Sequence, residues 1–179
     1  MSILSKTSII ATVLVAFTTG AAAIDGHFNG PYIGADVGFT DEGEFYYGAN
    51  AGIRTQTYNN IVFGAEATFG DYAVSEDFNI SGQTVTAGID YSWSAVGYIG
   101  YVFGLDKRNL IKLGAGYNSF HVFAESQGIK DSDSAGDVRT FVGYERAFVG
   151  NWNLRLEANY IKVEGSDGSM ATIGLAYQF

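Results

Sequence analysis

Apolar and polar residues alternate with a period of two through most of the chain. The pattern is clearest at the end of the sequence, where Ala171, Ile173, Leu175, Tyr177 and Phe179 alternate with small or polar residues. This period is typical of β-strands whose two faces meet different surroundings. Residues 171–179 are therefore predicted to form a strand with one apolar and one polar face.

Seven further segments repeat this alternation, so the chain is predicted to hold eight strands. The eight segments are 31–40, 45–56, 61–74, a long fourth one that ends at 103, 111–118, 138–148, 154–160 and 171–179. Eight strands of about 11 residues use about 90 residues and leave room for turns and loops. We predict an all-β fold, an eight-stranded antiparallel up-and-down transmembrane β-barrel in one domain.

Polar stretches between the segments predict the connections. Residues 57–60, 105–109 and 149–153 are expected to form short turns, and residues 75–83 and 125–137 to form longer loops. Bacterial barrels place short turns in the periplasm and longer loops outside the cell. An even number of strands puts both ends of the barrel on one side, which we therefore expect to be periplasmic.

A soluble β-sandwich or lipocalin-like fold would also alternate, so the chemistry of the two faces must decide. A sandwich buries the apolar face and leaves charges in solvent, where glycine brings no advantage. In this sequence the charged residues share their face with glycines, as in Gly64, Glu66 and Gly70. A narrow lumen needs this combination, because charged side chains must fit beside bare backbone.

The first residues have the composition of a secretory signal peptide. Lys6 precedes an apolar stretch from Ile9 to Phe17, which is followed by small residues ending at Ala23. That stretch is shorter than the about 20 apolar residues of a membrane-spanning helix. Residues 1–23 are predicted to be a cleaved signal peptide, residues 24–179 the barrel, and the bacterial outer membrane its location.

The composition excludes several kinds of partner and cofactor. The chain has no cysteine and one proline, so no disulfide supports it. Its formal net charge is −9, which argues against nucleic acid because no basic stripe can neutralise phosphates. His27 and His121 have no neighbours with metal-ligand spacing. We expect neither a metal nor another cofactor.

Charged residues on the predicted inward face form the first candidate site. Seven of them share this parity: Arg54, Glu66, Lys112, Arg139, Glu145, Arg155 and Glu157. An unpaired buried charge costs several kcal/mol, so we predict a network of salt bridges and hydrogen bonds that plugs the lumen. The alternatives are a small porin or passive channel, and a pair of carboxylates for acid–base catalysis.

Ser119 and His121 share a face that faces lipid by parity, with Glu125 nearby. A serine, a histidine and an acid could serve a lipid-facing outer-membrane hydrolase, although this order and spacing match no hydrolase motif. We therefore predict a protein that is not an enzyme and keep the hydrolase as an alternative.

Aromatic residues on the outward face predict two interfacial girdles. One group lies near the periplasmic ends (Tyr101, Phe103, Trp152, Tyr177 and Phe179), and the other near the outer ends (Phe39, Tyr47 and Phe69). A ligand-stacking platform is the rival interpretation, but rings at headgroup depth need no ligand to explain them.

Several stretches resemble the OmpA/opacity-type outer-membrane β-barrel proteins, from about Phe28 to Phe179. They are Phe28–Gly34, Phe63–Glu66, Gly97–Phe103, Leu154–Glu157 and Ile173–Phe179. The chain departs from the family in its very short first connection, Asp41 to Glu44, and in having no peptidoglycan-binding domain after the barrel. These departures weaken an adhesin role based on long loops and remove a cell-wall tether.

The resemblance implies a monomer with structural, adhesive or host-facing roles in outer-membrane lipid and lipopolysaccharide. It also implies folding by the β-barrel assembly machinery, with Tyr177 and Phe179 as the terminal signal. A structural barrel and a recognition protein that binds a host or surface ligand through its loops both stay open. The acidic loops carry few aromatic anchors apart from Phe78, and recognition usually needs such anchors.

Overall fold

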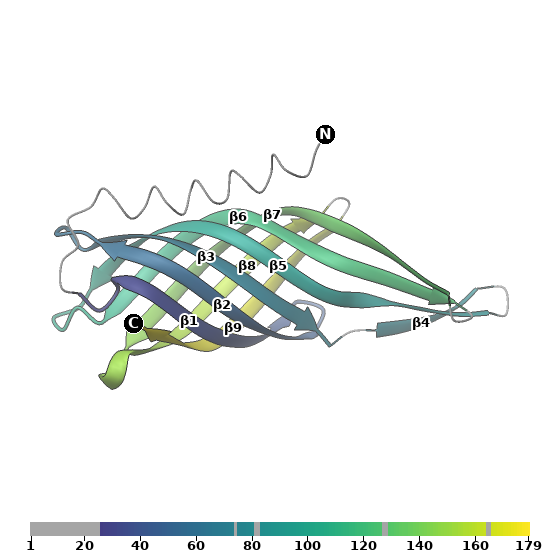
Figure 1. The fold of residues 1–179 in the computed structure, drawn as a ribbon, viewed down its shortest axis with the longest axis horizontal. Helices are drawn as coiled ribbons and strands as arrows, with labels where there is room; N and C mark the ends of the chain where they lie inside the picture. Colours follow the sequence, from purple (N-terminus) through teal and green to yellow (C-terminus); the bar gives the residue numbers. More distant parts are fainter. Residues whose placement is uncertain (1–25, 74, 81–82, 127–128, 164–165) are drawn as a thin grey trace.

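The computed structural model describes residues 26–73, 75–80, 83–126, 129–163 and 166–179, which form one closed barrel (Figure 1). The predicted signal peptide lies outside these residues. Nine strands are described: β1 (Gly30–Thr40), β2 (Phe45–Gln56), β3 (Ile61–Tyr72), β4 (Ser75–Ile80), β5 (Gln83–Phe103), β6 (Asn109–Ser126), β7 (Ile129–Ala147), β8 (Trp152–Val163) and β9 (Ser166–Gln178). They form one antiparallel sheet in the order β3-β2-β1-β9-β8-β7-β6-β5-β4.

Two strand pairings close the barrel and confirm the predicted eight-stranded fold. The first and last strands pair, with Ala35 opposite Leu175. Strand β3 pairs with β5, with Ala67 opposite Ala95, and this pairing leaves β4 outside the ring. Closure gives each of the eight ring strands a partner on both sides, which a lipid environment requires.

The regions predicted as two long loops are largely β-structure, and in the described residues the loop prediction is wrong. Strand β4 pairs with β5 from Ser75 opposite Gly88 to Ile80 opposite Gln83, and β6 pairs with β7 as far as Ser126 opposite Ile129. Polar composition hid these strands, because beyond a membrane both faces of a sheet can meet water. Strand β4 and the far parts of β5, β6 and β7 project beyond the ring (Figure 1). We call this the extended end.

The opposite end holds the carboxyl terminus and three tight connections, and we call it the short-turn end. Residues 57–60, 104–108 and 148–151 turn the chain here, at the positions predicted for short turns. Asn60, Lys107 and Asn151 have φ angles of 62°, 53° and 66°. Asparagine tolerates this left-handed conformation better than most residues, which suits two of the three turns.

The strand faces differ as the alternation predicts. Outward side chains are apolar and exposed, as for Leu113 at 62% and Leu175 at 50%, whereas the inward Asn50 and Ser94 are buried. Apolar groups that face away from the core suit lipid, and polar groups that face inward suit a barrel lumen. No helix within the described ranges is long and apolar enough to cross a membrane.

Aromatic side chains gather on the outer surface near both ends of the barrel. At the short-turn end the ring of Tyr177 lies 5.3 Å from the rings of Trp152 and Phe179. Toward the extended end, Phe39 lies 5.4 Å from Phe45. Two such bands match the interfacial girdles of outer-membrane barrels.

Candidate functional site

The lumen holds a layer of buried charged side chains supplied by six strands. It contains the seven residues expected there and one more, and each is less than 10% exposed: Asp36 (β1), Arg54 (β2), Glu66 (β3), Lys112 (β6), Arg139 and Glu145 (β7), and Arg155 and Glu157 (β8). The period-two alternation positions all eight, because each lies on the inward parity of its strand. Four cations and four carboxylates balance, and we call this set the lumen network.

Arg155 stands at the centre of the lumen network and contacts all four carboxylates. Its Nη2 lies 2.6 Å from Glu157 Oε1 and 2.9 Å from Glu66 Oε2. Its Nε lies 3.8 Å from both Asp36 Oδ1 and Glu145 Oε1. A planar guanidinium with five donors suits such a position, since it can bind several acceptors at once.

Glu145 and Lys112 extend the lumen network toward the short-turn end. Glu145 lies 2.6 Å from both Arg54 Nη1 and Lys112 Nζ, and the same Nζ lies 2.7 Å from Glu157. Arg54 also donates from Nε to Gln178 Oε1 at 2.7 Å. Gln178 lies on β9 and Arg54 on β2, and both strands pair with β1. This contact therefore links the two neighbours of the first strand, where the barrel closes.

Arg139 lies nearer the extended end than Glu145, the other member of the lumen network on β7. Its guanidinium donates to Asn159 Oδ1 at 2.7 and 2.9 Å and to Ser94 Oγ at 2.6 Å. Its ion pair with Glu157 is longer, at 3.6 Å. Neutral acceptors therefore supply most of the hydrogen bonds of this cation.

Asp36 is the member of the lumen network that the sequence-based set omits. Its Oδ2 accepts a 2.5 Å hydrogen bond from Asn50 Nδ2, and Asn50 Oδ1 accepts one of 2.6 Å from Arg155. The signal was present in the sequence, since Asp36 lies on the same face as Tyr32 and Gly34. With Asp36 included, the inward charges of the strands are four cations and four carboxylates.

Glycines on the inward face give the charged groups their space. A Cβ atom at Gly143 would lie 2.8 Å from Lys112 Cε and 3.2 Å from Glu157 Cγ, both closer than ordinary carbon contacts. A Cβ at Gly64 would overlap the ring of Tyr98. These close approaches explain why glycine and charge share one face of the strands.

Each carboxylate of the lumen network has a cation within 4 Å, an arrangement that holds charge in place rather than preparing a free acid or base. Across the described ranges no group of three or more histidine, cysteine, aspartate or glutamate residues could hold a metal ion. The geometry favours rigid packing of the lumen over chemistry within it.

Two cavities flank the lumen network, one at each end of the barrel. The cavity at the short-turn end has a volume of about 590 Å³ and polar walls that include Gln56, Asn153 and Gln178. The cavity at the other end, the extended-end cavity, has a volume of about 280 Å³. The two share no lining residue, and no member of the lumen network lines either.

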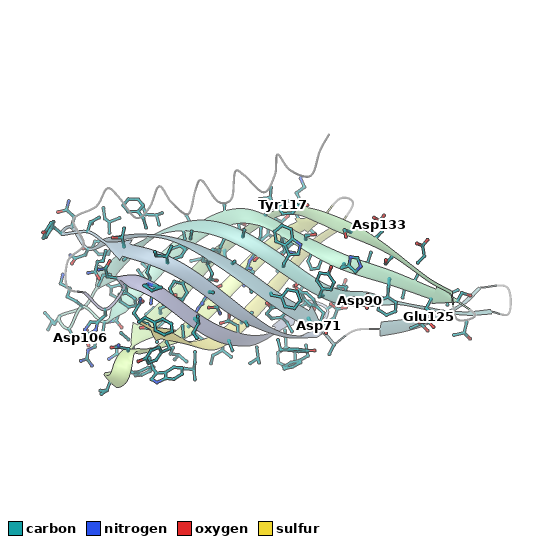
Figure 2. The ribbon with its side chains drawn as sticks, in the orientation of Figure 1. Asp71, Asp90, Asp106, Tyr117, Glu125 and Asp133 are labelled. Carbon is teal, nitrogen blue, oxygen red and sulfur yellow. The ribbon has the colours of Figure 1, made fainter. Side chains whose placement is uncertain are left out.

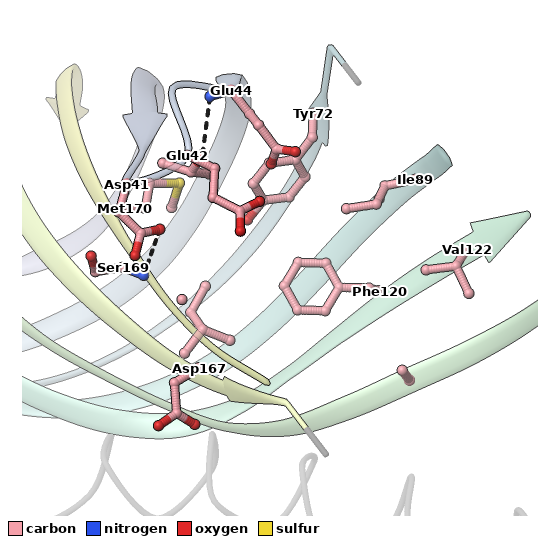
Figure 3. A pocket seen from close by; sticks show the side chains of 14 residues that line it. Asp41, Glu42, Glu44, Tyr72, Ile89, Phe120, Val122, Asp167, Ser169 and Met170 are labelled. Carbon is pink, nitrogen blue, oxygen red and sulfur yellow. Dashed lines mark hydrogen bonds between the residues drawn. The ribbon is translucent and has the colours of Figure 1, made fainter. Parts of the chain in front are cut away.

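The extended-end cavity has an apolar floor beneath an acidic rim (Figure 3). Tyr72, Ile89, Phe120 and Met170 belong to the floor. The rim carries four acidic side chains, three from the connection between β1 and β2 and one from β9: Asp41, Glu42, Glu44 and Asp167. The cavity therefore combines an apolar surface with negative charge.

Charge is distributed unevenly along the barrel axis. The sequence segments 41–44, 71–90, 121–137 and 162–167 contain thirteen acidic residues and two lysines, and the described residues of these segments lie toward the extended end. The short-turn segments 57–60, 104–109 and 146–153 contain one acid and three cations. Asp71 lies near the end of ring strand β3, at the base of the extension, and Asp90, Glu125 and Asp133 lie on the strands that form it. Asp106 lies at the opposite end (Figure 2).

The candidate hydrolase residues make a different contact from the expected one. His121 Nδ1 lies 3.0 Å from Ser134 Oγ on the neighbouring strand β7, and its ring stacks on Tyr91 at 4.8 Å. Ser119 is buried, opposite Trp93 in the strand register. Glu125 pairs with Thr86, four register positions beyond the Tyr91–His121 pair along the sheet. The contact that the structure makes is therefore His121 with Ser134.

Tyr177 and Phe179, the predicted assembly signal, lie at the short-turn end. Phe179 N donates to Pro31 O at 3.0 Å, so the last residue is fixed to the first strand. Its side chain stays 64% exposed beside Tyr177. The ring of Phe179 therefore remains accessible on the outer surface of the finished barrel, whereas Tyr177 is half-buried.

Solved structures with the same fold include two bacterial proteins. Ail, the attachment invasion locus protein of Yersinia pestis, aligns with a TM-score of 0.62 and 14% identity over 84% of this chain and 99% of its own. Neisserial surface protein A aligns with a TM-score of 0.57 and 19% identity over 84% of this chain and 98% of its own. At these identities the likeness shows the fold alone.

Another neighbour is described as an enzyme. The outer membrane enzyme PagL aligns with a TM-score of 0.52 and 12% identity over 83% of this chain and 99% of its own. Ail has also been solved in complex with the heparin analogue sucrose octasulfate. Among curated proteins, no sequence matches this chain.

A family model identifies the group to which the sequence belongs. The model for the outer membrane protein beta-barrel domain matches residues 9–179, almost the whole chain. The match agrees with the closed eight-stranded ring, the apolar outer surface and the polar lumen. The chain therefore belongs to the outer membrane protein beta-barrel family.

Proposed function

We propose that this protein is a non-conducting outer-membrane barrel with a structural role and a surface-exposed recognition role at its extended end. The observation that carries the proposal is the separation of charge. Paired ions fill the middle of the barrel, and a predominantly acidic extension projects from one end. The first feature supports rigidity, and the second supports contact with a partner.

The lumen network supports a sealed barrel. Its ion pairs span six strands, and the cavities on either side have no lining residue in common. An ion that crossed the lumen would have to displace buried pairs, and breaking one such pair costs about 3–5 kcal/mol. The small-porin alternative would need a continuous aqueous path through this layer.

Bacterial barrels with short periplasmic turns and longer outer connections support an orientation with the extended end outside the cell. The extension then reaches beyond the lipid and is available to a host or surface ligand. Its acidity argues against a sulfated ligand such as the one bound by Ail, because like charges repel. A basic partner fits this surface better.

In this proposal the barrel is a monomer in outer-membrane lipid and lipopolysaccharide, delivered after cleavage of residues 1–23. The outward-facing rings of Tyr177 and Phe179 at the chain end serve as the signal to the β-barrel assembly machinery. The outward aromatic bands hold the finished barrel at the two interfaces. No catalytic step and no cofactor belongs to this role.

Shortening the extension separates the two roles. One variant lacks residues 75–88 and 123–132, each deletion running between paired positions of the register, with short turns in their place, so the ring itself is kept. We expect cells with this variant to lose adhesion but to keep the detergent resistance of the parent. Cells without the whole protein should lose both, and unchanged adhesion in the shortened variant would contradict the recognition role.

A lipid-facing hydrolase is the second candidate, favoured by the 3.0 Å contact between His121 Nδ1 and Ser134 Oγ on the outer surface. A serine beside a histidine is the minimum for nucleophilic catalysis. Purified protein would be incubated with phospholipid and lipopolysaccharide, and released fatty acid would be measured for the parent and for Ser134→Ala and Ser119→Ala. Release that either substitution abolishes would establish this function, and no release from the parent would reject it.

A further inference from the structure

We propose that the extended-end cavity binds a basic peptide segment of a partner protein, with one apolar side chain on the cavity floor and flanking basic groups at the rim. This inference names the partner class for the recognition role above and rests on that role: the extension makes the wider contact with the partner protein, and the cavity beside it binds one segment of that partner. It depends on three features: the floor, the rim and the charge around them.

The floor is a packed apolar surface rather than a loose gap. The ring of Tyr72 lies 5.0 Å from that of Tyr46 and 5.6 Å from that of Phe120, and Met170 packs in the same cluster. Pockets for whole drug-sized ligands have volumes of about 300–1,000 Å³. The cavity, at about 280 Å³, is therefore suited to one apolar side chain rather than a large ligand.

The rim holds its carboxylates on a fixed turn. Asp41 N donates to Ser169 O at 2.9 Å, and Ser169 N donates back to Asp41 Oδ1 at 3.2 Å (Figure 3). Glu44 N donates to Thr40 Oγ1 at 3.0 Å, and Gly43 takes the left-handed conformation with a φ of 88°. A turn already ordered in this way loses little entropy when a ligand arrives, which favours binding.

The charge of the rim selects against other apolar ligands. Fatty acids, lipid A and sulfated glycans all carry negative charge and would be repelled by Glu42 and its neighbours. A basic side chain next to an aromatic or aliphatic one matches both parts of the cavity. Because exposed rim residues such as Asp41 and Glu42 surround a floor of buried and half-buried ones, a backbone can pass across the rim while one side chain enters.

A short capped peptide tests the proposal with the full mature chain in zwitterionic nanodiscs. The probe has one phenylalanine between two arginines, separated by glycines, and carries a fluorophore for anisotropy measurements at low salt. We expect saturable binding that weakens about fivefold when the phenylalanine becomes alanine, and that disappears when both arginines become glutamates. Affinity should also fall as salt is added, because the rim contacts are exposed.

Matched substitutions separate the cavity from general acidity. Glu42→Gln with Glu44→Gln should weaken binding about fivefold, whereas Asp131→Asn with Asp133→Asn removes the same charge from the extension and should have almost no effect. Ala135→Phe, which fills the cavity, should abolish binding, and Ala124→Phe outside it should not. Heat-modifiable gel mobility confirms that each variant is a folded barrel.

Several results would overturn the proposal. Equal weakening by the two charge pairs would show binding to overall acidity rather than to the cavity. Binding of phenethylamine as tight as that of the peptide would assign the cavity to a small ammonium ligand instead. If the peptide does not bind while the shortened extension still abolishes adhesion, this inference fails and the proposed recognition role stands.

Discussion

Charged residues are paired and balanced in the lumen, whereas at the extended end acidic residues greatly outnumber basic ones. In the lumen four cations face four carboxylates, and each carboxylate lies within 4 Å of a cation. In the segments of the extended end, thirteen acids accompany two lysines. The difference follows from burial, because a buried charge must be paired whereas a solvated one can repeat the sign of its neighbours.

This contrast assigns a separate contribution to each region. Stability depends on the lumen network, where every substitution disturbs several contacts. Partner choice depends on the extended end, where a substitution changes the local field but little of the packing. A protein built in this way can change its surface charge without losing its fold.

Removing the central cation should have the largest effect. Arg155→Met leaves Asp36, Glu66 and Glu157 without their shared partner, and we expect a loss of about 3–5 kcal/mol in the free energy of unfolding. Urea titration of the barrel in lipid vesicles measures this loss. The control Lys162→Met removes an exposed cation and should cost less than about 0.5 kcal/mol. Equal stability of the two variants would contradict the paired lumen.

Placing a charge on the outward face of a ring strand tests whether that face meets lipid. Leu113 points outward from the middle of the ring, and Leu113→Arg should cost about 2–4 kcal/mol in a bilayer. Leu105 is fully exposed in a connection at the short-turn end, so Leu105→Arg is the matched control and should cost almost nothing. The same urea titration compares them, and a harmless arginine at 113 would mean that this face does not meet lipid.

Gly64 faces the lumen and Gly97 faces outward, so alanine at each position compares the packing of the two faces. A methyl group at Gly64 would collide with the Tyr98 ring, whereas at Gly97 the nearest atom would be 4.0 Å away. We expect Gly64→Ala to cost about 1–3 kcal/mol through overpacking and Gly97→Ala to cost much less. Unfolding midpoints of the two variants provide the measurement, and a reversed order would contradict the packing of the lumen.

The smallest effect is expected at the rim of the extended-end cavity. Glu42→Gln removes one exposed carboxylate, and the free energy of unfolding should change by less than about 0.5 kcal/mol. The same substitution is expected to weaken peptide binding, which would separate stability from recognition in one residue. A large loss of stability here would show that the rim supports the fold.

Sequence patterns predict the ring well because membrane strands obey a strict period of two. Parity alone places Arg54, Glu145 and Arg155 on the inward face, since a shift by one residue would expose each of them to lipid. The same rule could have added Asp36. What parity cannot supply is contact geometry, such as the position of Arg155 among four carboxylates, which depends on the curvature of the closed barrel.

The extended end was predicted less well, for a physical reason. Beyond the membrane both faces of a strand meet water, so the alternation that marks a membrane strand fades in Ser132 to Gly136. The extended-end cavity joins Tyr72, Phe120 and Met170 from three strands, and His121 meets Ser134 across a strand pair. These contacts join residues on different strands, so they cannot be predicted from spacing in the sequence unless the pairing register of the strands is known.

Planar-bilayer recording tests the sealed lumen most directly. Purified mature protein is inserted at low concentration and current is recorded over a range of voltages, with Arg155→Met as the variant that opens the lumen network. We expect no stable conductance steps for the parent and irregular openings for the variant. Uniform, stable steps from the parent barrel would contradict the sealed lumen.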